Sequence, residues 1–191
     1  MNYIPNIISG LRILLIPIFA YFIINNYYAY AFYFFVVMCI SDALDGYIAR
    51  LLRCESVSGA YLDAIADKLM IIVSFYILYT MNIIPLYIFV IAVLRDFIIF
   101  CGIILNLNSG FDNIIKINPI FISKINTFMQ MVLVIYCLLF LNNIINLHYI
   151  QDVINTVLLT TIFSAAEYVY NYKNTSKYKG SNRSMRYSSN I

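Results

Sequence analysis

The chain alternates between long apolar runs and short polar links. Six runs of about 20 residues, long enough to cross a bilayer as helices, lie near 7–25, 27–45, 60–81, 84–106, 119–141 and 147–171. Strands are disfavoured because the runs are too long and lack polar alternation. The pattern predicts an all-α integral membrane domain of six transmembrane helices over residues 1–171.

Composition supports this class. Of the 191 residues, 63% are hydrophobic and only 11% are charged, whereas a soluble domain carries about 25% charged residues. We therefore expect membrane lipid as the surroundings and no nucleic-acid partner. Residues 172–191 depart from the pattern because they are polar and basic, which predicts a disordered cytoplasmic tail.

The distribution of Lys and Arg predicts the topology. The links after the first, third and fifth runs contain neither residue, whereas the other links and the tail do. Cytoplasmic loops carry the excess of Lys and Arg, so both termini should be cytoplasmic. The first run lacks a basic leader and a clear cleavage site, which favours a retained span. No Arg-rich transit segment precedes it, which favours a bacterial plasma membrane over a mitochondrial inner membrane.

Aspartates gather at the cytoplasmic ends of the second and third predicted helices. Asp42 and Asp45 are three residues apart, and Asp63 and Asp67 are four apart, so each pair shares a helix face. A short link joins the two helices, so the pairs should converge near the membrane surface. Four carboxylates without His or Cys suit hard ions, Mg²⁺ or Mn²⁺, and are enough to hold two of them. Paired metals commonly serve displacement at phosphorus.

Two other interpretations of this stretch remain open. The aspartates could form internal ion pairs, Asp45 with Arg50 and Asp63 with Lys68. Alternatively, a divalent-cation transporter could use the same carboxylates without any enzymatic step.

Small residues flank the aspartates, and Arg50 lies one helical turn after one of these small residues, Gly46. Gly46, Ala49 and Gly59 would allow close helix packing, or would let a substrate approach the backbone. Arg50 could clamp a diphosphate opposite the metals.

These residues together resemble a family signature. The pattern Asp42-x2-Asp45-Gly46-x2-Ala49-Arg50-x8-Gly59-x3-Asp63-x3-Asp67 is similar to that of the CDP-alcohol phosphatidyltransferases at every fixed position. The resemblance implies six spanning helices, a homodimer, and transfer of a phosphatidyl group from CDP-diacylglycerol to an alcohol with release of CMP.

The resemblance also implies roles for individual residues. The implied metal ligands are Asp42, Asp45, Asp63 and Asp67, and Asp67 is also the implied general base on the acceptor hydroxyl. The implied nucleotide-binding residues are Asp42, Gly46, Ala49, Gly59 and the diphosphate-contacting Arg50.

Basic residues inside other apolar runs are candidates for binding the acceptor. Arg12, Arg95 and Lys124 lie in the first, fourth and fifth runs, and buried bases need anionic partners. A phosphate on the acceptor is one candidate partner. Pairing with the aspartate cluster or with Asp96 is the alternative.

The stretch Ser123-Lys124-Ile125-Asn126-Thr127 indicates the identity of the acceptor, and Asn126 is the fourth candidate for binding it. This stretch, with "IPNIISGLRI" and "LRDFII", resembles the CMP-forming cardiolipin synthases, whereas phosphatidylglycerophosphate synthases tend to read Gly-Lys-x-Lys-Thr. Asn126 in place of Lys removes a positive charge, which suits phosphatidylglycerol better than the doubly charged glycerol 3-phosphate. The phosphatidylglycerophosphate synthase reaction remains the alternative.

Overall fold

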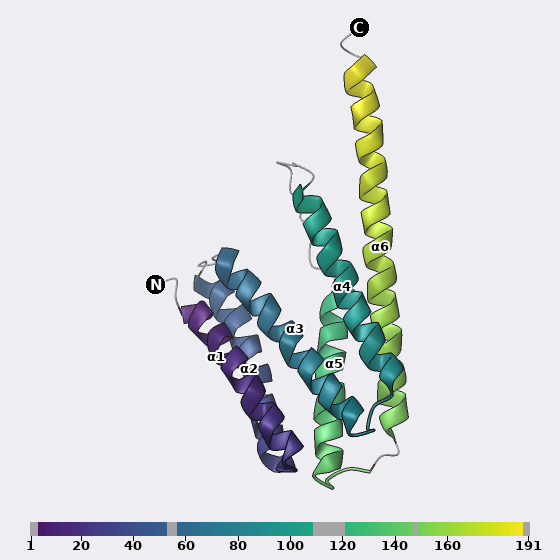
Figure 1. Ribbon diagram of the computed structural model, residues 1–191. Coiled ribbons are helices and arrows are strands. Elements are labelled where there is room, and N and C mark those ends of the chain that lie inside the picture. The colour runs from purple at the N-terminus through teal and green to yellow at the C-terminus, as the bar shows by residue number, and fades with distance from the viewer. Residues whose placement is uncertain (1–3, 53–56, 109–120, 147–148, 189–191) are drawn as a thin grey trace.

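The structure is a computed structural model that describes the backbone of residues 4–52, 57–108, 121–146 and 149–188. Side chains are described for residues 10–44, 65–101, 122–146 and 149–170. Figure 1 shows the helices in order, α1 (Ile4–Ile24), α2 (Tyr28–Leu52), α3 (Val57–Thr80), α4 (Leu86–Asn108), α5 (Phe121–Leu141) and α6 (Ile150–Ser188). The described residues are thus all-helical, as the apolar runs predict.

The helices run alternately up and down. Both termini lie at the upper end in Figure 1, together with the end of α2, the start of α3 and the end of α4. α1 packs against α2 and α3, while α5 packs against α2, α3 and α6, and α4 packs against α3 and α6. The group formed by α1, α2 and α3 is therefore joined to the group formed by α4, α5 and α6 mainly through α3 and α5.

The bundle carries apolar side chains outside and several polar side chains inside. Leu14, Ile24 and Phe163 are among the exposed large side chains, whereas Arg12 and Arg95 are buried. In lipid the outer surface has no need to be polar, and rare charged residues face the bundle interior. Two described segments, Ile122–Leu141 and Ile150–Tyr170, are long and apolar enough to cross a membrane. The arrangement indicates membrane association, and the count of six spans stays a prediction.

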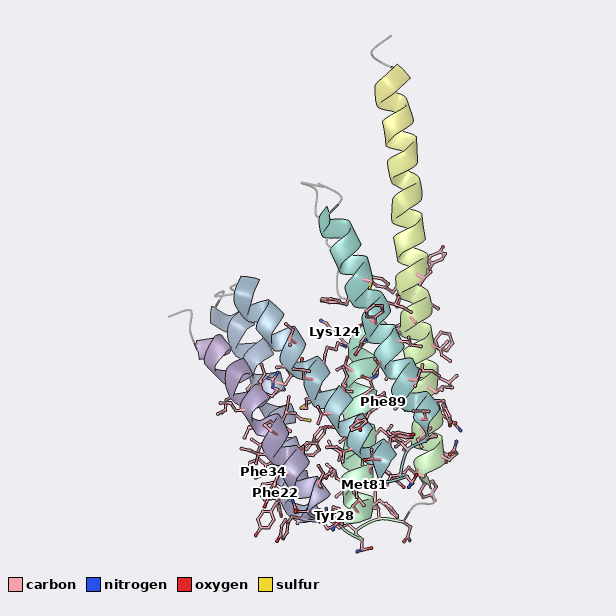
Figure 2. The ribbon with its side chains drawn as sticks, viewed as in Figure 1. Phe22, Tyr28, Phe34, Met81, Phe89 and Lys124 are labelled. Carbon is pink, nitrogen blue, oxygen red and sulfur yellow. The ribbon has the colours of Figure 1, made fainter. Side chains whose placement is uncertain are left out.

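Aromatic rings gather where α1 and α2 meet at the lower end. The Phe22 ring stacks on Phe34 with centroids 5.1 Å apart and on Tyr30 at 5.5 Å. Figure 2 shows Phe22, Phe34 and Tyr28 together at this end. Aromatic residues, Trp and Tyr above all, are enriched at membrane–water interfaces, so this cluster fits a bundle end at such a boundary.

α6 continues past the apolar run near 147–171 into polar, basic sequence. Its helical backbone continues to Ser188, over 39 residues, through the segment whose composition predicts disorder. Extending an existing helix adds one hydrogen bond per residue fixed, without a new nucleation step. The apolar first half of α6 can therefore carry the helix into polar sequence that contains no Pro.

Asparagine ends α1, α3 and α5 at the lower end of the bundle. Each of these helices is followed by an Asn with a positive φ angle, namely Asn26 (63°), Asn82 (58°) and Asn143 (58°). After α3, Asn82 N donates to Tyr79 O at 2.9 Å and Ile83 N donates to Leu78 O at 3.0 Å. This pair of bonds defines a Schellman motif, which pairs carbonyls that the helix end leaves free. The same two bonds recur after α1 and α5.

We expect the side chain at position 82 to control stability through this backbone conformation. Asn82→Gly should be tolerated, because Gly adopts a positive φ freely. Asn82→Val should destabilise the protein by about 1–2 kcal/mol, because a branched Cβ clashes in the left-handed region. Thermal unfolding of the two variants in detergent tests this, and equal stability of Val and Gly at this position would contradict it.

Candidate functional site

One buried guanidinium joins α1, α2 and α3. Arg12 is 1% exposed, and its Nη1 lies 3.0 Å from Asp42 Oδ1 and 2.5 Å from Asp67 Oδ1. The Asp42 and Asp67 side chains remain 24% and 22% exposed. The structure therefore brings two of the predicted site aspartates together, from two different helices, on one nitrogen of Arg12.

The spacing of buried residues explains why these three side chains meet. On α1, Arg12 precedes the buried Ile16, Phe19 and Ile23 at intervals of four, three and four residues. Such spacing keeps side chains on a single seam of a helix that faces its neighbours. Asp42 follows the same intervals on α2 after Ala31, Phe35 and Met38, and Asp67 does so on α3 before Ile71, Ser74 and Leu78. Each polar group thus occupies the upper end of an otherwise mostly apolar seam.

The remaining signature residues lie in helical backbone whose side chains are outside the described part. These residues are Asp45, Gly46, Ala49 and Arg50 on α2, and Gly59 and Asp63 on α3. Asp45 and Asp63 lie one helical turn from Asp42 and Asp67, toward the upper end of the bundle.

The described part of the site supplies some of the oxygen ligands that a metal ion would need. Within the described side chains, no three His, Cys, Asp or Glu residues gather as a metal-binding group. Asp42 and Asp67 contribute converging, partly exposed carboxylates, and oxygen donors fit Mg²⁺ or Mn²⁺. A complete centre would also need Asp45 and Asp63, so the predicted two-ion site stays a prediction.

A second buried cluster surrounds Arg95 on α4. Arg95, 2% exposed, places Nη1 2.6 Å from Asp96 Oδ1, and its Nη2 donates to Ser123 Oγ at 2.5 Å and to Ser164 Oγ at 2.6 Å. Asp96 Oδ1 also lies 2.7 Å from Lys68 Nζ. The cluster ties α3, α4, α5 and α6 together, and it shares α3 with the Arg12 cluster, because Lys68 follows Asp67 in the sequence.

The sequence left two kinds of partner for the buried arginines, an acceptor phosphate or internal carboxylates. In the structure both arginines pair with internal carboxylates. Arg12 pairs with Asp42 and Asp67, and Arg95 pairs with Asp96. Lys124 differs, because its side chain is exposed. Figure 2 shows it near the upper end of α5, where a charged ligand could reach it.

The amide oxygen of Asn126 is bonded to α6, so only the amide nitrogen could meet a ligand. Its Oδ1 accepts hydrogen bonds from Thr160 Oγ1 at 3.1 Å and Thr161 Oγ1 at 2.7 Å. Its Nδ2 is buried and has no hydrogen-bond partner among the described residues. Asn126 Nδ2 therefore keeps its N–H donors for a group outside the described residues.

Gln130 was given no role by the sequence. It is completely buried, and neither Oε1 nor Nε2 has a partner among the described side chains and backbone. A buried amide without a hydrogen bond costs roughly 1–3 kcal/mol in proteins. The signal available in the sequence was a polar stripe on α5, because Ser123, Asn126 and Gln130 follow intervals of three and four residues in an apolar helix.

Apolar helices that enclose charged clusters indicate a class, the membrane-associated helical proteins with a polar interior site. Residues 2–166 match the family model described as CDP-alcohol phosphatidyltransferase. The chain belongs to the CDP-alcohol phosphatidyltransferase family, as its signature predicts.

Relatives with two different names are similar to this chain. The chloroplastic CDP-diacylglycerol–glycerol-3-phosphate 3-phosphatidyltransferase 1 of Oryza sativa subsp. japonica is 32% identical over 151 residues, which are 71% of this chain and 46% of that protein. A Pseudomonas fluorescens protein named CDP-diacylglycerol–glycerol-3-phosphate 3-phosphatidyltransferase is 46% identical over 78 residues, 39% of this chain and 40% of that protein. The Homo sapiens cardiolipin synthase (CMP-forming) is 31% identical over 145 residues, 69% of this chain and 48% of that protein. The chain thus matches less than half the length of each.

Proposed function

We propose that this protein transfers a phosphatidyl group from CDP-diacylglycerol to phosphatidylglycerol and releases CMP, the reaction of a cardiolipin synthase. The supporting observation is the meeting of Asp42 and Asp67 on Arg12 Nη1. It brings carboxylates from two helices to one partly exposed point in an apolar bundle, where a lipid-bound diphosphate and an acceptor hydroxyl could meet them.

In this proposal each side chain has a definite task. Asp67 accepts the proton of the acceptor hydroxyl as its oxygen attacks the β-phosphorus of CDP-diacylglycerol, the one bearing the diacylglycerol. The phosphorus–oxygen bond to CMP breaks, and Arg50 binds the diphosphate. Arg12 holds Asp67 in place through the 2.5 Å contact. The metal ligands would be Asp42, Asp45, Asp63 and Asp67, and a bound Mg²⁺ or Mn²⁺ would neutralise the charge on the diphosphate.

The setting we propose is a bacterial plasma membrane crossed by all six helices. The upper end in Figure 1, which carries both termini, would face the cytoplasm, because the links and tail there contain the Lys and Arg residues. The acyl chains of the donor could then stay in lipid while its nucleotide enters from water.

Glycerol 3-phosphate is the second candidate acceptor. It is favoured by the names of the rice and Pseudomonas fluorescens relatives and by the exposed Lys124, which could pair with a dianionic phosphate. Phosphatidylglycerol is favoured by Asn126, which is neutral and already bonded to α6 through its oxygen. A neutral amide compensates a second negative charge less well than a lysine does.

The acceptor preference can be measured with the purified 191-residue chain. CDP-diacylglycerol and Mg²⁺ or Mn²⁺ are supplied with either phosphatidylglycerol or glycerol 3-phosphate, and CMP is quantified. We expect release to be at least about tenfold faster with phosphatidylglycerol. EDTA should abolish release, and excess Mg²⁺ should restore it.

Two outcomes would contradict the proposed cardiolipin synthase reaction. CMP release with glycerol 3-phosphate alone would favour the second candidate reaction. No CMP with either acceptor, combined with cation flux in proteoliposomes, would favour a transporter.

A further inference from the structure

Gln130 lies in the interior of the bundle, and its amide has no hydrogen-bond partner among the described residues. It is 0% exposed, and the next buried residues along α5 are the apolar Leu133 and Val134. α5 packs against α6 and also against α2 and α3, so a fully buried side chain on it is enclosed by several helices. Both polar atoms of the Gln130 amide lack a partner in the described part of the chain.

A buried amide of this kind disfavours folding unless a hydrogen-bonding group reaches it. An apolar side chain of similar shape would fill the same space without that cost. Residues that break a local rule of stability tend to occur at functional sites. Gln130 is therefore better explained by a polar ligand than by packing.

Asn126 supplies a second donor one helical turn before Gln130. Residues four apart on a helix have Cβ atoms about 6 Å apart and share a face. Thr160 and Thr161 hold Asn126 Oδ1, which fixes the amide plane and leaves Nδ2 without a partner among the described residues. The stripe thus offers donors on Asn126 and Gln130, together with one acceptor, Gln130 Oε1.

This combination identifies the chemistry of the ligand. A hydroxyl group both donates and accepts hydrogen bonds, so it can satisfy the acceptor Oε1 and the amide donors together. A phosphate accepts only and would face Oε1 unfavourably, while a metal ion would find a single oxygen. The pair is neutral, which also disfavours a charged ligand.

We infer that Gln130 and Asn126 form a binding site for a neutral hydroxyl group, the hydroxyl of the acceptor's glycerol headgroup that does not react. This rests on the proposed function, because a phosphatidylglycerol headgroup carries two free hydroxyls and only one attacks phosphorus. α5 packs directly against α2 and α3, which carry Asp42 and Asp67. A hydroxyl held on α5 would orient the headgroup so that the other hydroxyl points toward Asp67.

The test compares Gln130→Met with the wild-type protein. Met has nearly the shape of Gln but no hydrogen-bonding amide, so the KM for phosphatidylglycerol should rise about tenfold while the KM for CDP-diacylglycerol stays unchanged. The melting temperature without lipid should rise by a few degrees, because the unpaired amide is gone. Gln151→Met is the matched control, since Gln151 is exposed on α6, and it should change none of these values.

A second measurement does not depend on turnover. Without CDP-diacylglycerol, phosphatidylglycerol should raise the melting temperature of the wild-type protein more than phosphatidylethanol, an anionic lipid whose headgroup has no free hydroxyl. Gln130→Met should lose that difference. Equal shifts with the two lipids, or an unchanged KM for phosphatidylglycerol in Gln130→Met, would overturn the inference. Failure of the wild-type protein to release CMP would instead count against the proposed function, and the lipid comparison would still decide the hydroxyl site.

Discussion

Replacing Arg12 with Met is expected to destabilise the protein by about 3 kcal/mol, the lower end of the range for breaking a buried ion pair. The Arg12 side chain is completely buried and contacts carboxylates on two other helices. Its loss would leave Asp42 and Asp67 facing each other without the intervening charge. The lower end applies because both aspartates stay about one-fifth exposed, so water can solvate part of each. Thermal or denaturant unfolding in detergent measures the effect.

Arg12→Lys separates the charge from the geometry. Lysine keeps the positive charge but lacks the planar, multi-donor head of arginine, so we expect a smaller loss of stability than in Arg12→Met. Exposed Lys124 supplies a control, because Lys124→Met removes a positive charge that no buried carboxylate contacts in the described structure. If Arg12→Met were as stable as Lys124→Met, the cluster would contribute little to the fold.

Asp67→Asn is expected to lower the rate of CMP release by about a thousandfold, within the range for removing a general base. Asparagine has nearly the same shape, but it cannot accept a proton from the acceptor hydroxyl at neutral pH. Nucleotide binding should be largely preserved, because the implied nucleotide-contacting residues are unchanged. CMP release reports the chemical step, and equilibrium binding of a CDP-diacylglycerol analogue reports the nucleotide site.

The matched control for this substitution is Asp152→Asn. Asp152 is an exposed aspartate in the first turn of α6, at the lower end of the bundle, and its replacement should leave turnover unchanged. Full activity of Asp67→Asn would refute the general-base role. Loss of nucleotide binding together with turnover would show that the proposed metal-binding role of Asp67, or a structural role, accounts for the loss and that the general-base role does not.

Both clusters place charge inside an apolar bundle, and they share α3. Asp67 faces Arg12, and Lys68, the next residue, reaches Asp96. A change in the position of α3 would therefore affect both clusters. We therefore expect that substitutions in the Arg95 cluster can alter the proposed site without touching a substrate.

The sequence alone predicts the positions of the helices and the family of the protein. The run near 119–141 corresponds to α5 at Phe121–Leu141, and the run near 84–106 to α4 at Leu86–Asn108. A bilayer-length apolar stretch can satisfy its backbone groups as a helix without help from other segments. The signature from Asp42 to Asp67 likewise determined the family. The helical backbone of α6 beyond residue 171 does not follow from composition, because composition does not show that a helix already formed can extend into polar sequence.

The tertiary structure alone decided what the buried charges contact. The sequence left Arg12 and Arg95 between a ligand phosphate and internal carboxylates, and the structure pairs them with Asp42, Asp67 and Asp96. Arg12 and Asp67 are 55 residues apart, and their contact depends on the rotation and depth of α1 against α3. Whether Gln130 finds a hydrogen-bond partner among the described residues also depends on which helices surround α5. Helical periodicity predicts which face is buried, but the partner of each buried group is set only when all the helices pack together.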